Sequence, residues 1–401
     1  MNTGWIIFIT AGKWQVSGIK KAKEMGHKIV AVDDNKNADG FIYSDLIINE
    51  NIFDTNKIIS VLKEKKIVPI GAISFCSEVG MTSVAKLNEY YNLPGLKLEL
   101  TNALLDKSIQ RTIWKDNNVE GPSDFQIFHN FKDAYKYLSQ IQTDYIIKPT
   151  RGAGSRGVKK IAYSNKTKLK EVLEISFNAS KTGTIIAEQY MPGVEYTVEV
   201  LIQNGNTQIL TVTEKDKVEG TDGLVASTLR SPTCSNDSLD KIKNLVTRAY
   251  KALNHNNGIG HAEVILSNDG KVGMVEAAGR GGGFGLFELL IPKVTGIDIV
   301  KKLINLSVGI NEPLRDILDN KFILDFFPSK KGILKEIKGF DKIDNRNNVY
   351  AISFVEVGQV FDNPATDGDR LGYIFCIGST IEEVQNKYIL NKKHIDFIFA
   401  E

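Results

Sequence analysis

The sequence is poor in cysteine, with three in 401 residues. Cys76, Cys234 and Cys376 lie far apart and form no CxxC pair, which argues against a structural zinc site and against a disulfide framework. Histidine is scarce too, at five residues, and none is an evident partner for a thiol. We therefore expect each cysteine to be a small buried or partly buried side chain rather than a catalytic nucleophile.

The sequence also lacks an excess of charge of one sign. Lys and Arg total 50, Asp and Glu total 48, and the formal net charge is +2. That balance predicts no general attraction to nucleic acid or to an anionic membrane. No apolar run approaches the roughly 18 residues of a membrane-spanning helix. The start Met1–Gly4 lacks the basic n-region of a signal peptide, so we expect a cytoplasmic protein.

The glycines of a dinucleotide-binding motif are missing from the N-terminal region. An apolar run at 5–10 ends at Ala11-Gly12, a helical stretch follows, and a second strand at 28–33 ends on an acid. This βαβ pattern predicts a Rossmann-like parallel sheet. Only Gly12 stands where the motif needs three glycines. An NAD-dependent oxidoreductase is therefore an alternative that the sequence disfavours.

What the chain does have is a glycine-rich, basic segment at 148–158, directly after the apolar run 145–147. Three glycines in six positions let the backbone turn tightly and bring its N–H groups against a ligand. Hydroxyls and cations surround them, which suits phosphate, although no Gly-Lys-[Ser/Thr] closes the segment as in a P-loop. A glycine-rich hairpin with a solvated basic face is the alternative.

Two glutamates are predicted to face each other across a hairpin. Strands at 260–266 and 271–276 flank an Asp-Gly dipeptide at 269–270, a strong tight-turn signal. With these two residues at the centre of the turn, Glu263 and Glu276 lie directly opposite, with Cβ atoms about 4.5–5.5 Å apart. A four-residue loop gives the same register, and a three-residue loop would break it. Two carboxylates that face each other destabilise the sheet unless a proton, a lysine or a metal offsets their charge. Hard oxygen ligands favour Mg²⁺, which would bridge to a nucleotide. The alternative is that the two side chains simply splay apart at the surface.

Polar residues on one strand and an arginine after another add to this picture. The strand 195–202 alternates cleanly, so Glu195, Thr197 and Glu199 share one face, which is either a solvent face or the polar wall of a cleft. Arg280 follows the second glutamate strand and precedes three glycines. Their amide groups suit a carboxylate or a second phosphate, with a flexible loop as the alternative.

The remaining segments predict ordinary elements. Residues 101–117 predict one amphipathic helix that carries Lys107, which taken alone is a solvated helix residue. Residues 217–236 have the composition of a loop, which with 281–290 is a candidate substrate loop. From Phe322 onward, short strands and one helix predict a small α+β unit, whose last strand ends near Ile377.

The order and spacing of these segments resemble the ATP-grasp superfamily, in particular its carboxylate–amine ligases of the biotin carboxylase and carbamoyl-phosphate synthase large-subunit kind. The resemblance covers nearly the whole chain. It implies an α/β and α+β protein with an N-terminal Rossmann-like parallel sheet, a two-subdomain nucleotide site and a small C-terminal α+β domain. The implied boundaries are 1–100, 101–315 with a lid subdomain at about 118–187, and 316–401.

The resemblance assigns nucleotide-binding residues. Lys107 and Lys148 match the two lysines that contact ATP phosphates. In the adenine hinge, Glu188 matches the residue near the adenine amino group, and the backbone of Tyr190 and Met191 lines the base. The other implied ATP contacts are the lid residues Gly152, Gly154, Ser155 and Gly157, the hinge residue Gln189 and the ribose-binding carboxylate Glu195.

The resemblance also assigns metal-binding and catalytic residues. Glu263 and Glu276 match ligands of Mg²⁺, with Mn²⁺ as the alternative cation. Arg280 matches the arginine that stabilises the acyl-phosphate step, and Lys148 belongs to the same catalytic set. The family usually reads Glu-x-Asn-x-Arg, where the asparagine completes metal binding, but this chain has Ala278 in that place. Either one metal position is weaker, or water or another side chain fills the gap.

The implied function is an ATP-dependent ligase that activates a small-molecule carboxylate as an acyl phosphate and joins it to an amine. Its implied partners are those two small molecules, without nucleic acid or membrane, and a homodimer is expected. A catalytically weak nucleotide-binding sensor is the alternative, and Ala278 is the feature that favours it.

Overall fold

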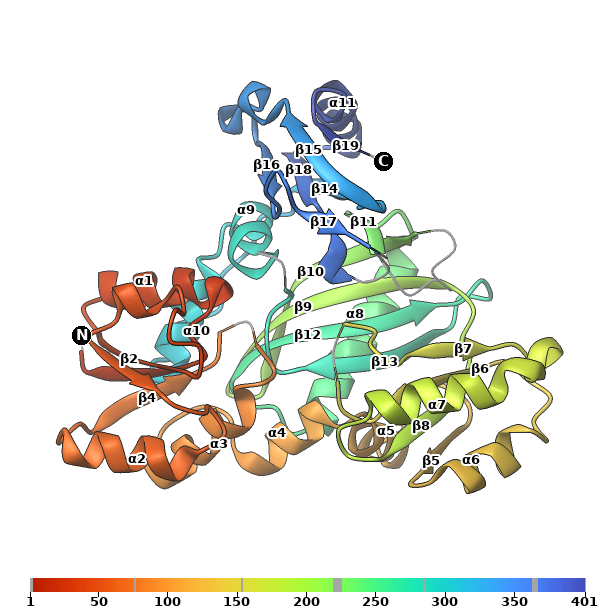
Figure 1. The fold of residues 1–401 in the computed structure, drawn as a ribbon, viewed down its shortest axis with the longest axis horizontal. Helices are drawn as coiled ribbons and strands as arrows, with labels where there is room; N and C mark the ends of the chain where they lie inside the picture. Colours follow the sequence, from red (N-terminus) through yellow and green to blue (C-terminus); the bar gives the residue numbers. More distant parts are fainter. Residues whose placement is uncertain are drawn as a thin grey trace.

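The computed structural model describes residues 3–75, 77–152, 154–218, 226–283, 286–362 and 367–400. An N-terminal sheet, a lid sheet, a large central sheet and a C-terminal layer make up the molecule (Figure 1). Cys76, Ala153 of the glycine-rich segment, and residues 219–225 and 284–285 of the candidate substrate loops lie outside the described residues. No helix within the described ranges is long and apolar enough to cross a membrane.

The N-terminal unit is a parallel sheet in the order β3-β2-β1-β4. Its central strand β1 is completely buried from Ile6 to Ile9, because helices lie over both faces of the sheet (Figure 1). The predicted Rossmann-like parallel sheet is therefore confirmed. Its elements are β1 Trp5–Ile9, β2 Lys28–Asp33, β3 Leu46–Asn49, β4 Pro69–Ile73, α1 Val16–Glu24, α2 Thr55–Glu64 and α3 Met81–Tyr90.

The lid sheet, named for the lid subdomain that the resemblance predicts, is a smaller antiparallel sheet in the order β5-β8-β6-β7. The glycine-rich segment leaves the end of β6, and helices α6 and α7 pack on the sheet around Ile147 and Leu173. Its elements are β5 Phe125–Phe128, β6 Tyr145–Pro149, β7 Lys159–Ile161, β8 Ile185–Gln189, α6 Phe131–Leu138 and α7 Leu169–Ala179.

The central sheet runs β13-β12-β9-β10-β11-β14-β18-β16, so its last three strands come from the C-terminal part of the chain. Tyr196, Val198 and Val200 of β9 pack with helix α8 on one face, as the alternation predicts. Thr197 and Glu199 point to the other face and are only 7% and 8% exposed, so that face is covered rather than solvated. The strands are β9 Val194–Gln203, β10 Asn206–Lys217, β11 Ala226–Arg230, β12 Gly258–Leu266, β13 Val272–Ala278, β14 Lys321–Phe327, β16 Val349–Ser353 and β18 Gly372–Gly378, and α8 spans Asn236–Ala252.

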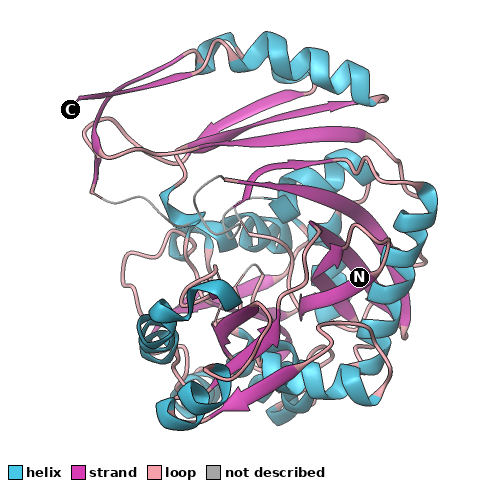
Figure 2. Ribbon diagram, turned by 90° about the vertical axis from the view of Figure 1, so that its right-hand side faces the viewer, coloured by secondary structure: helices cyan, strands magenta, loops and turns pink. Residues whose placement is uncertain are grey.

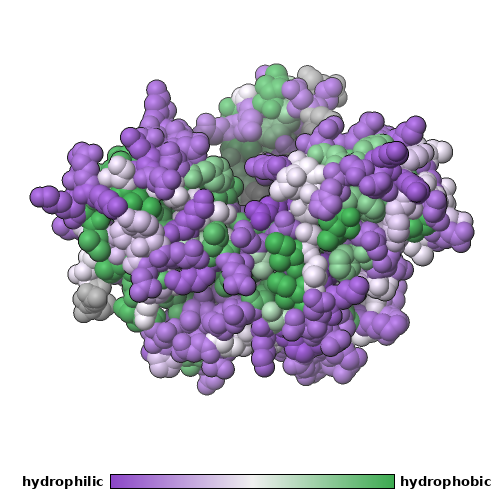
Figure 3. All heavy atoms as spheres, turned by 90° about the horizontal axis from the view of Figure 1, so that it is seen from below, coloured by the Kyte–Doolittle hydropathy of each residue, from purple (hydrophilic) through white to green (hydrophobic). Residues whose placement is uncertain are grey.

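A second C-terminal layer, the sheet β17-β15-β19, lies at the top of the molecule with helix α11 beside it (Figure 2). Helices α4, α5, α9 and α10 connect the larger units. Seen from below, the surface is mainly hydrophilic, with small scattered hydrophobic areas (Figure 3). The remaining elements are β15 Gly332–Lys338, β17 Val360–Phe361, β19 Asp396–Ala400, α4 Leu98–Leu105, α5 Lys107–Asp116, α9 Ile291–Thr295, α10 Ile299–Ser307, α11 Ile381–Lys392, the π-helical turn η4 Leu286–Leu290, and the short 3₁₀ turns η1 Lys13–Gln15, η2 Phe41–Tyr43, η3 Tyr163–Lys168, η5 Phe340–Lys342, η6 Asn345–Asn347 and η7 Asp367–Asp369.

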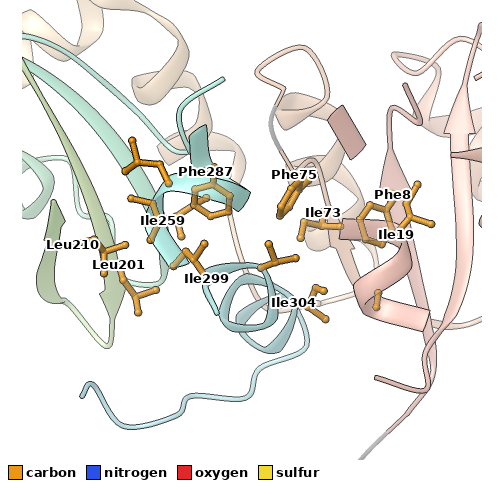
Figure 4. Packing of buried hydrophobic residues seen from close by; sticks show 14 of the residues in the cluster. Phe8, Ile19, Ile73, Phe75, Leu201, Leu210, Ile259, Phe287, Ile299 and Ile304 are labelled. Atoms are coloured by element: carbon orange, nitrogen blue, oxygen red, sulfur yellow. The ribbon is translucent and has the colours of Figure 1, made fainter. Parts of the chain in front are cut away.

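One hydrophobic cluster joins the N-terminal sheet to the central sheet. Ile299 and Ile304 of α10 lie between Phe8 on one side and Ile259 on the other (Figure 4). Nearby, the rings of Phe75 and Phe287 meet edge to face with centroids 5.4 Å apart. This shared core fixes the carboxyl edge of the parallel sheet against the central sheet, where the candidate site lies.

Three predictions about elements were wrong. The single helix 101–117 is two helices, because Asp106 leaves the helical conformation and its carboxylate caps α5 by accepting from the Ser108 N–H. The loop 217–236 contains β11, which pairs with both β10 and β14. The C-terminal unit has two more strands than predicted, β17 and β19, and both pair with β15. In the last two cases a partner strand distant in the sequence decides the structure, and local composition carries no sign of it.

A buried histidine near the end of helix α8 is expected to make folding stability fall at acid pH. His255 is 2% exposed, its Nε2–H donates to the Ile259 carbonyl at 3.1 Å, and its buried Nδ1 has no partner among the residues that the structure describes. Burial lowers the pKa of His255 to about 4. Between pH 6.5 and about pH 4, His255 is protonated in the unfolded state but stays neutral in the folded state. The free energy of unfolding therefore falls as the pH falls through this window, by about 3 kcal/mol in total.

The expected measurement is the free energy of unfolding in urea between pH 7 and pH 4. His255→Gln should flatten the profile, whereas His394→Gln, at an exposed histidine, should leave it unchanged. Parallel profiles for wild type and His255→Gln would contradict this assignment.

Candidate nucleotide and metal site

The predicted pair of glutamates is present: Glu263 of β12 and Glu276 of β13 are register partners. The turn that joins the strands differs from the prediction. The Ser267 N–H donates to the Lys271 carbonyl at 2.9 Å, so three residues form the loop, and Gly270 adopts φ +77°. Such a loop alone would break the register, but a β-bulge next to Glu263 restores it.

Arg111 of α5 holds the bulged part of β13. Its guanidinium donates to the carbonyls of Met274 and Val275, at 2.9 Å each. The Met274 N–H donates to the Glu120 carbonyl at 2.8 Å instead of to the neighbouring strand. Backbone groups freed by the bulge are therefore satisfied from outside the hairpin, and a contact from a distant helix helps to set the register of the glutamates.

Each of the two glutamates is paired with a lysine. Lys107 Nζ lies 3.0 Å from Glu276 Oε2, and Lys215 Nζ lies 3.0 Å from Glu263 Oε1. Burial opposes charge on the lysines, but the carboxylates more than offset it, so the pKa of Lys107 and that of Lys215 are raised. Burial is likewise outweighed at Glu263, where Lys215 lowers the pKa of the carboxyl group. Of the three ways to offset the facing charges, this structure shows the lysine.

Lys107 also ties the glycine-rich segment to the site. Its Nζ donates to the Gly152 carbonyl at 2.8 Å, and its backbone N–H donates to the Thr150 carbonyl at 2.8 Å. Nearby, Arg151 Nε lies 3.1 Å from Asp106 Oδ2. The start of the segment therefore lies next to Glu276, and Lys107 is a bridging residue rather than a solvated one.

The other lid residues turn through left-handed backbone. Gly154, Ser155 and Gly157 have φ of +68°, +56° and +74°. Gly157 is the most constrained, because an added Cβ would lie 2.4 Å from the Cβ of Ala179. The segment therefore needs glycine at this point both for its backbone conformation and for its close approach to α7.

Lys148 and Glu188 are brought together in a buried ionic cluster. Lys148 Nζ lies 2.7 Å from Glu188 Oε2, and Arg111 Nε lies 2.9 Å from Glu188 Oε1. All three side chains are at most 5% exposed. Burial opposes ionisation of Glu188, but Arg111 and Lys148 outweigh it and lower the pKa of this carboxyl. The cluster connects β6, β8 and α5, and through Arg111 it reaches the bulge in β13.

The hinge residues after β8 lie beside the glutamate hairpin. Lys160 Nζ is 3.6 Å from the centroid of the Tyr190 ring. Met191 approaches Gly273 of β13 so closely that a Cβ on Gly273 would lie 2.7 Å from the Met191 sulfur. The hinge therefore packs directly on the strand that carries Glu276.

Gln189 and Glu195 are both engaged by neighbours. The Gln189 side-chain oxygen accepts a hydrogen bond from the Ser123 hydroxyl. Glu195 pairs with Lys215 and, at 2.6 Å, with Lys217. Lys215 thus bridges Glu195 and Glu263, so the residues predicted for ribose and for metal are linked by one ammonium group.

Arg280 joins the central sheet to the N-terminal sheet. Its Nε and Nη2 donate to Glu78 Oε1 at 3.0 and 2.6 Å, and its Nη1 donates to the Gly281 carbonyl at 2.9 Å. Burial opposes its charge, but Glu78 more than compensates and raises the pKa of Arg280. Glu78 follows β4, at the carboxyl edge of the parallel sheet, where open α/β sheets bind ligands.

His261 lies on the same face of β12 as Glu263. Its Nδ1–H donates to Glu199 Oε1 at 2.5 Å, and its Nε2 is 4.0 Å from Glu263 Oε1. Burial lowers the pKa of His261, but the Glu199 carboxylate raises it by more, so the net effect is an increase. The polar face of β9 is therefore the wall of the site, as one of the two readings of its alternation predicts.

Comparison with known families agrees with this geometry. Residues 141–288 match the ATP-grasp domain, and residues 325–399 match the L-amino acid ligase C-terminal domain 2. Residues 141–288 therefore belong to the ATP-grasp family of domains. The matched ATP-grasp segment contains the glycine-rich loop, the hinge and both facing glutamates.

Two solved structures share the whole fold. The L-amino acid ligase of Bacillus licheniformis superposes on 100% of this chain and 99% of its own with a TM-score of 0.83, at 21% identity. The phosphoribosylglycinamide synthetase of Anaerococcus prevotii has a TM-score of 0.76 and 20% identity, with 100% of both chains covered. At these identities the similarity establishes the fold.

Curated relatives match over a shorter length. The phosphoribosylamine–glycine ligase of Pyrococcus furiosus is 23% identical over 217 residues, which are 50% of this chain and 47% of that protein. The alanine–anticapsin ligase of Bacillus subtilis is 24% identical over 267 residues, or 61% of this chain and 55% of that protein. The chain thus spans about half the length of the curated relatives it matches.

The ATP-grasp site fits a divalent cation in its donor chemistry. Glu263 and Glu276 supply hard carboxylate oxygens from neighbouring strands. Their present partners are Lys107 and Lys215, and the described part of the chain contains no group of three His, Cys, Asp or Glu side chains already arranged to hold a metal. A cation would therefore have to replace ammonium groups at these carboxylates.

Sequence reasoning missed Arg111, Glu78 and the contact between His261 and Glu199. Arg111 could have been found, because it follows Lys107 by four residues on one helix and so shares its face. Glu78 had no comparable signal, since its partner Arg280 is two hundred and two residues away.

Proposed function

We propose that this protein is an ATP-dependent ligase that converts a small-molecule carboxylate into an acyl phosphate and joins it to an amine. The observation that carries the proposal is the facing pair Glu263 and Glu276, with Lys107 bridging from the pair to the glycine-rich segment. Positive and negative groups thus meet at one place beside the glycine-rich segment, as transfer of a phosphoryl group requires.

The reaction proceeds in two displacements. A carboxylate oxygen of the substrate attacks the γ-phosphorus of ATP, the bond to the β-phosphate oxygen breaks, and ADP leaves. The amine nitrogen then attacks the acyl carbon, phosphate leaves, and the nitrogen loses a proton. A divalent cation at Glu263 and Glu276, Mg²⁺ or Mn²⁺, would supply neutralisation of phosphate charge.

The chain's own residues position and neutralise the reacting groups. Lys107 and Lys148 are assigned to the phosphates of ATP. The segment 188–191 is assigned to adenine, and Glu195 to the ribose once Lys215 releases it. Arg280 is assigned to the charge that develops on the transferred phosphoryl group. The lid excludes water from the acyl phosphate, which would otherwise hydrolyse.

Amino acids are the first substrate class to test, because residues 325–399 match a domain of L-amino acid ligases. An NAD-dependent reaction is disfavoured by Asp33, whose two carboxylate oxygens already accept the backbone N–H groups of Ala11 and Asn35, at 2.7 and 2.9 Å. A homodimer remains an expectation that light scattering on the purified protein would test.

The deciding experiment is phosphate release from Mg·ATP with pools of small carboxylates, amino acids first, each with and without pools of amines. We expect a carboxylate-dependent rate that one amine pool raises further, and hydroxylamine should trap the acyl phosphate as a hydroxamate. Tight ATP binding with no stimulation by any pool would contradict the ligase and favour a nucleotide sensor.

A further inference from the structure

His261 stands at the centre of the site without a role in the proposed chemistry. It lies in a row across three strands, with Glu199 of β9 on one side and Ala278 of β13 on the other. The adjacent row contains Thr197, Glu263 and Glu276 in the same order of strands. The imidazole is therefore next to both facing glutamates.

The Glu199 carboxylate fixes the imidazole. Nδ1–H donates to Glu199 Oε1 at 2.5 Å, which leaves Nε2 as the nitrogen directed to the glutamates, 4.0 Å from Glu263 Oε1. A histidine that ligates a metal through one nitrogen commonly donates its other N–H to a carboxylate. Two ligands of one octahedral cation lie about 3 to 4 Å apart, since each bond is about 2.1 Å long. The separation of Nε2 and Oε1 is of that size.

Ala278 leaves room beside the imidazole. Its methyl group is the side chain directly across from His261, and register partners have Cβ atoms about 4.5–5.5 Å apart. A larger side chain at 278 would compete with His261 for the space next to Glu276. The small residue and the oriented imidazole are therefore complementary.

We propose that Nε2 of His261 is a third protein ligand, beside Glu263 and Glu276, of the divalent cation that accompanies the nucleotide. This inference rests on the proposed function, because it concerns the same site in its nucleotide-bound state. It requires Lys215 to leave Glu263 when the cation enters. A nitrogen ligand shifts the site's preference from Mg²⁺ toward later first-row ions such as Co²⁺, which bind imidazole more strongly.

Electron spin-echo spectroscopy on the wild-type protein with Mn²⁺ and ADP tests the ligand directly. We expect modulation from a directly bound ¹⁴N nucleus, and its replacement by a ¹⁵N pattern when the protein carries ¹⁵N-labelled histidine. Mn²⁺ bound with ADP but without histidine nitrogen coupling overturns this inference and leaves the ligase intact. No binding of Mn²⁺ in the presence of ADP overturns both this inference and the metal site of the proposed function.

Variants then separate ligation from a structural role. His261→Gln should lower the affinity for Co²⁺, measured by displacement of EPR-visible Mn²⁺, roughly tenfold more than the affinity for Mg²⁺, and Glu199→Gln should do so to a smaller extent. His394→Gln changes an exposed histidine and should alter neither affinity. Equal losses for Co²⁺ and Mg²⁺ in His261→Gln would overturn the proposal, because a residue that only shapes the site does not discriminate between the two ions.

Discussion

Replacing Glu276 with glutamine is expected to lower carboxylate-dependent phosphate release from ATP by roughly 10³-fold or more. The change removes one of the two facing charges and keeps the size of the side chain. Charge neutralisation of a transferring phosphoryl group by a bound cation is worth several kcal/mol, and each 1.4 kcal/mol is about a factor of ten in rate. The measurement is the initial rate of phosphate release at saturating substrate, together with the melting temperature.

The matched control is Glu336→Gln. Glu336 is also a strand glutamate with a lysine at 2.9 Å, but it lies half-exposed in β15, away from the candidate site. We expect its rate to equal that of the wild type. Full turnover in Glu276→Gln would contradict the assignment of Glu276 as a metal ligand. A large fall in the melting temperature of the variant would show that Glu276 acts through folding.

The second large effect is expected in stability. Glu188→Gln should lower the free energy of unfolding by about 3–5 kcal/mol, since it leaves Arg111 and Lys148 buried without a counter-charge. Urea unfolding at pH 7 measures this directly. Glu312→Gln breaks the pair of Glu312 with Lys302 in a more exposed setting and should cost no more than about 1 kcal/mol.

A triple variant separates buried charge from packing. Arg111→Met, Glu188→Leu and Lys148→Met together remove all three charges, so most of the stability lost in Glu188→Gln should return. ATP binding should be lost in the triple variant even where stability returns, because Lys148 is assigned to the phosphates. If the triple variant is as unstable as Glu188→Gln, the loss comes from the altered backbone at the bulge, which Arg111 supports, rather than from unpaired charge.

The facing glutamates show how far sequence reasoning reaches. The Asp-Gly turn signal and strand alternation predicted their register, and the structure has that register. The assumed turn was nevertheless wrong: a three-residue loop and a bulge compensate each other. Strand alternation depends on local spacing, so it can be predicted from the sequence. The bulge cannot, because it depends on Arg111, which comes from another part of the chain.

In the rest of the site, too, local sequence patterns were predictable and contacts between distant residues were not. The glycine-rich segment and the polar face of β9 are local patterns, and both lie at the site. The pairing of Lys215 with Glu263 and of Arg280 with Glu78 joins residues from different elements. Such pairs depend on how sheets pack, which single-sequence patterns do not encode. The resemblance assigned roles to these residues, and those roles stay predictions, whereas their present partners, mostly oppositely charged side chains, come from the structure.

The compensated hairpin also has a practical consequence. Arg111 and Glu120 hold β13 below the tip, so the three-residue loop can change in length or composition while the glutamates keep their positions. Asn268 at this tip is exposed, and Met191 of the hinge packs a few residues away against Gly273. A fluorescent group carried on a short insertion at Asn268 would therefore sit beside the predicted adenine hinge, where a change in its emission would report the proposed nucleotide binding in real time.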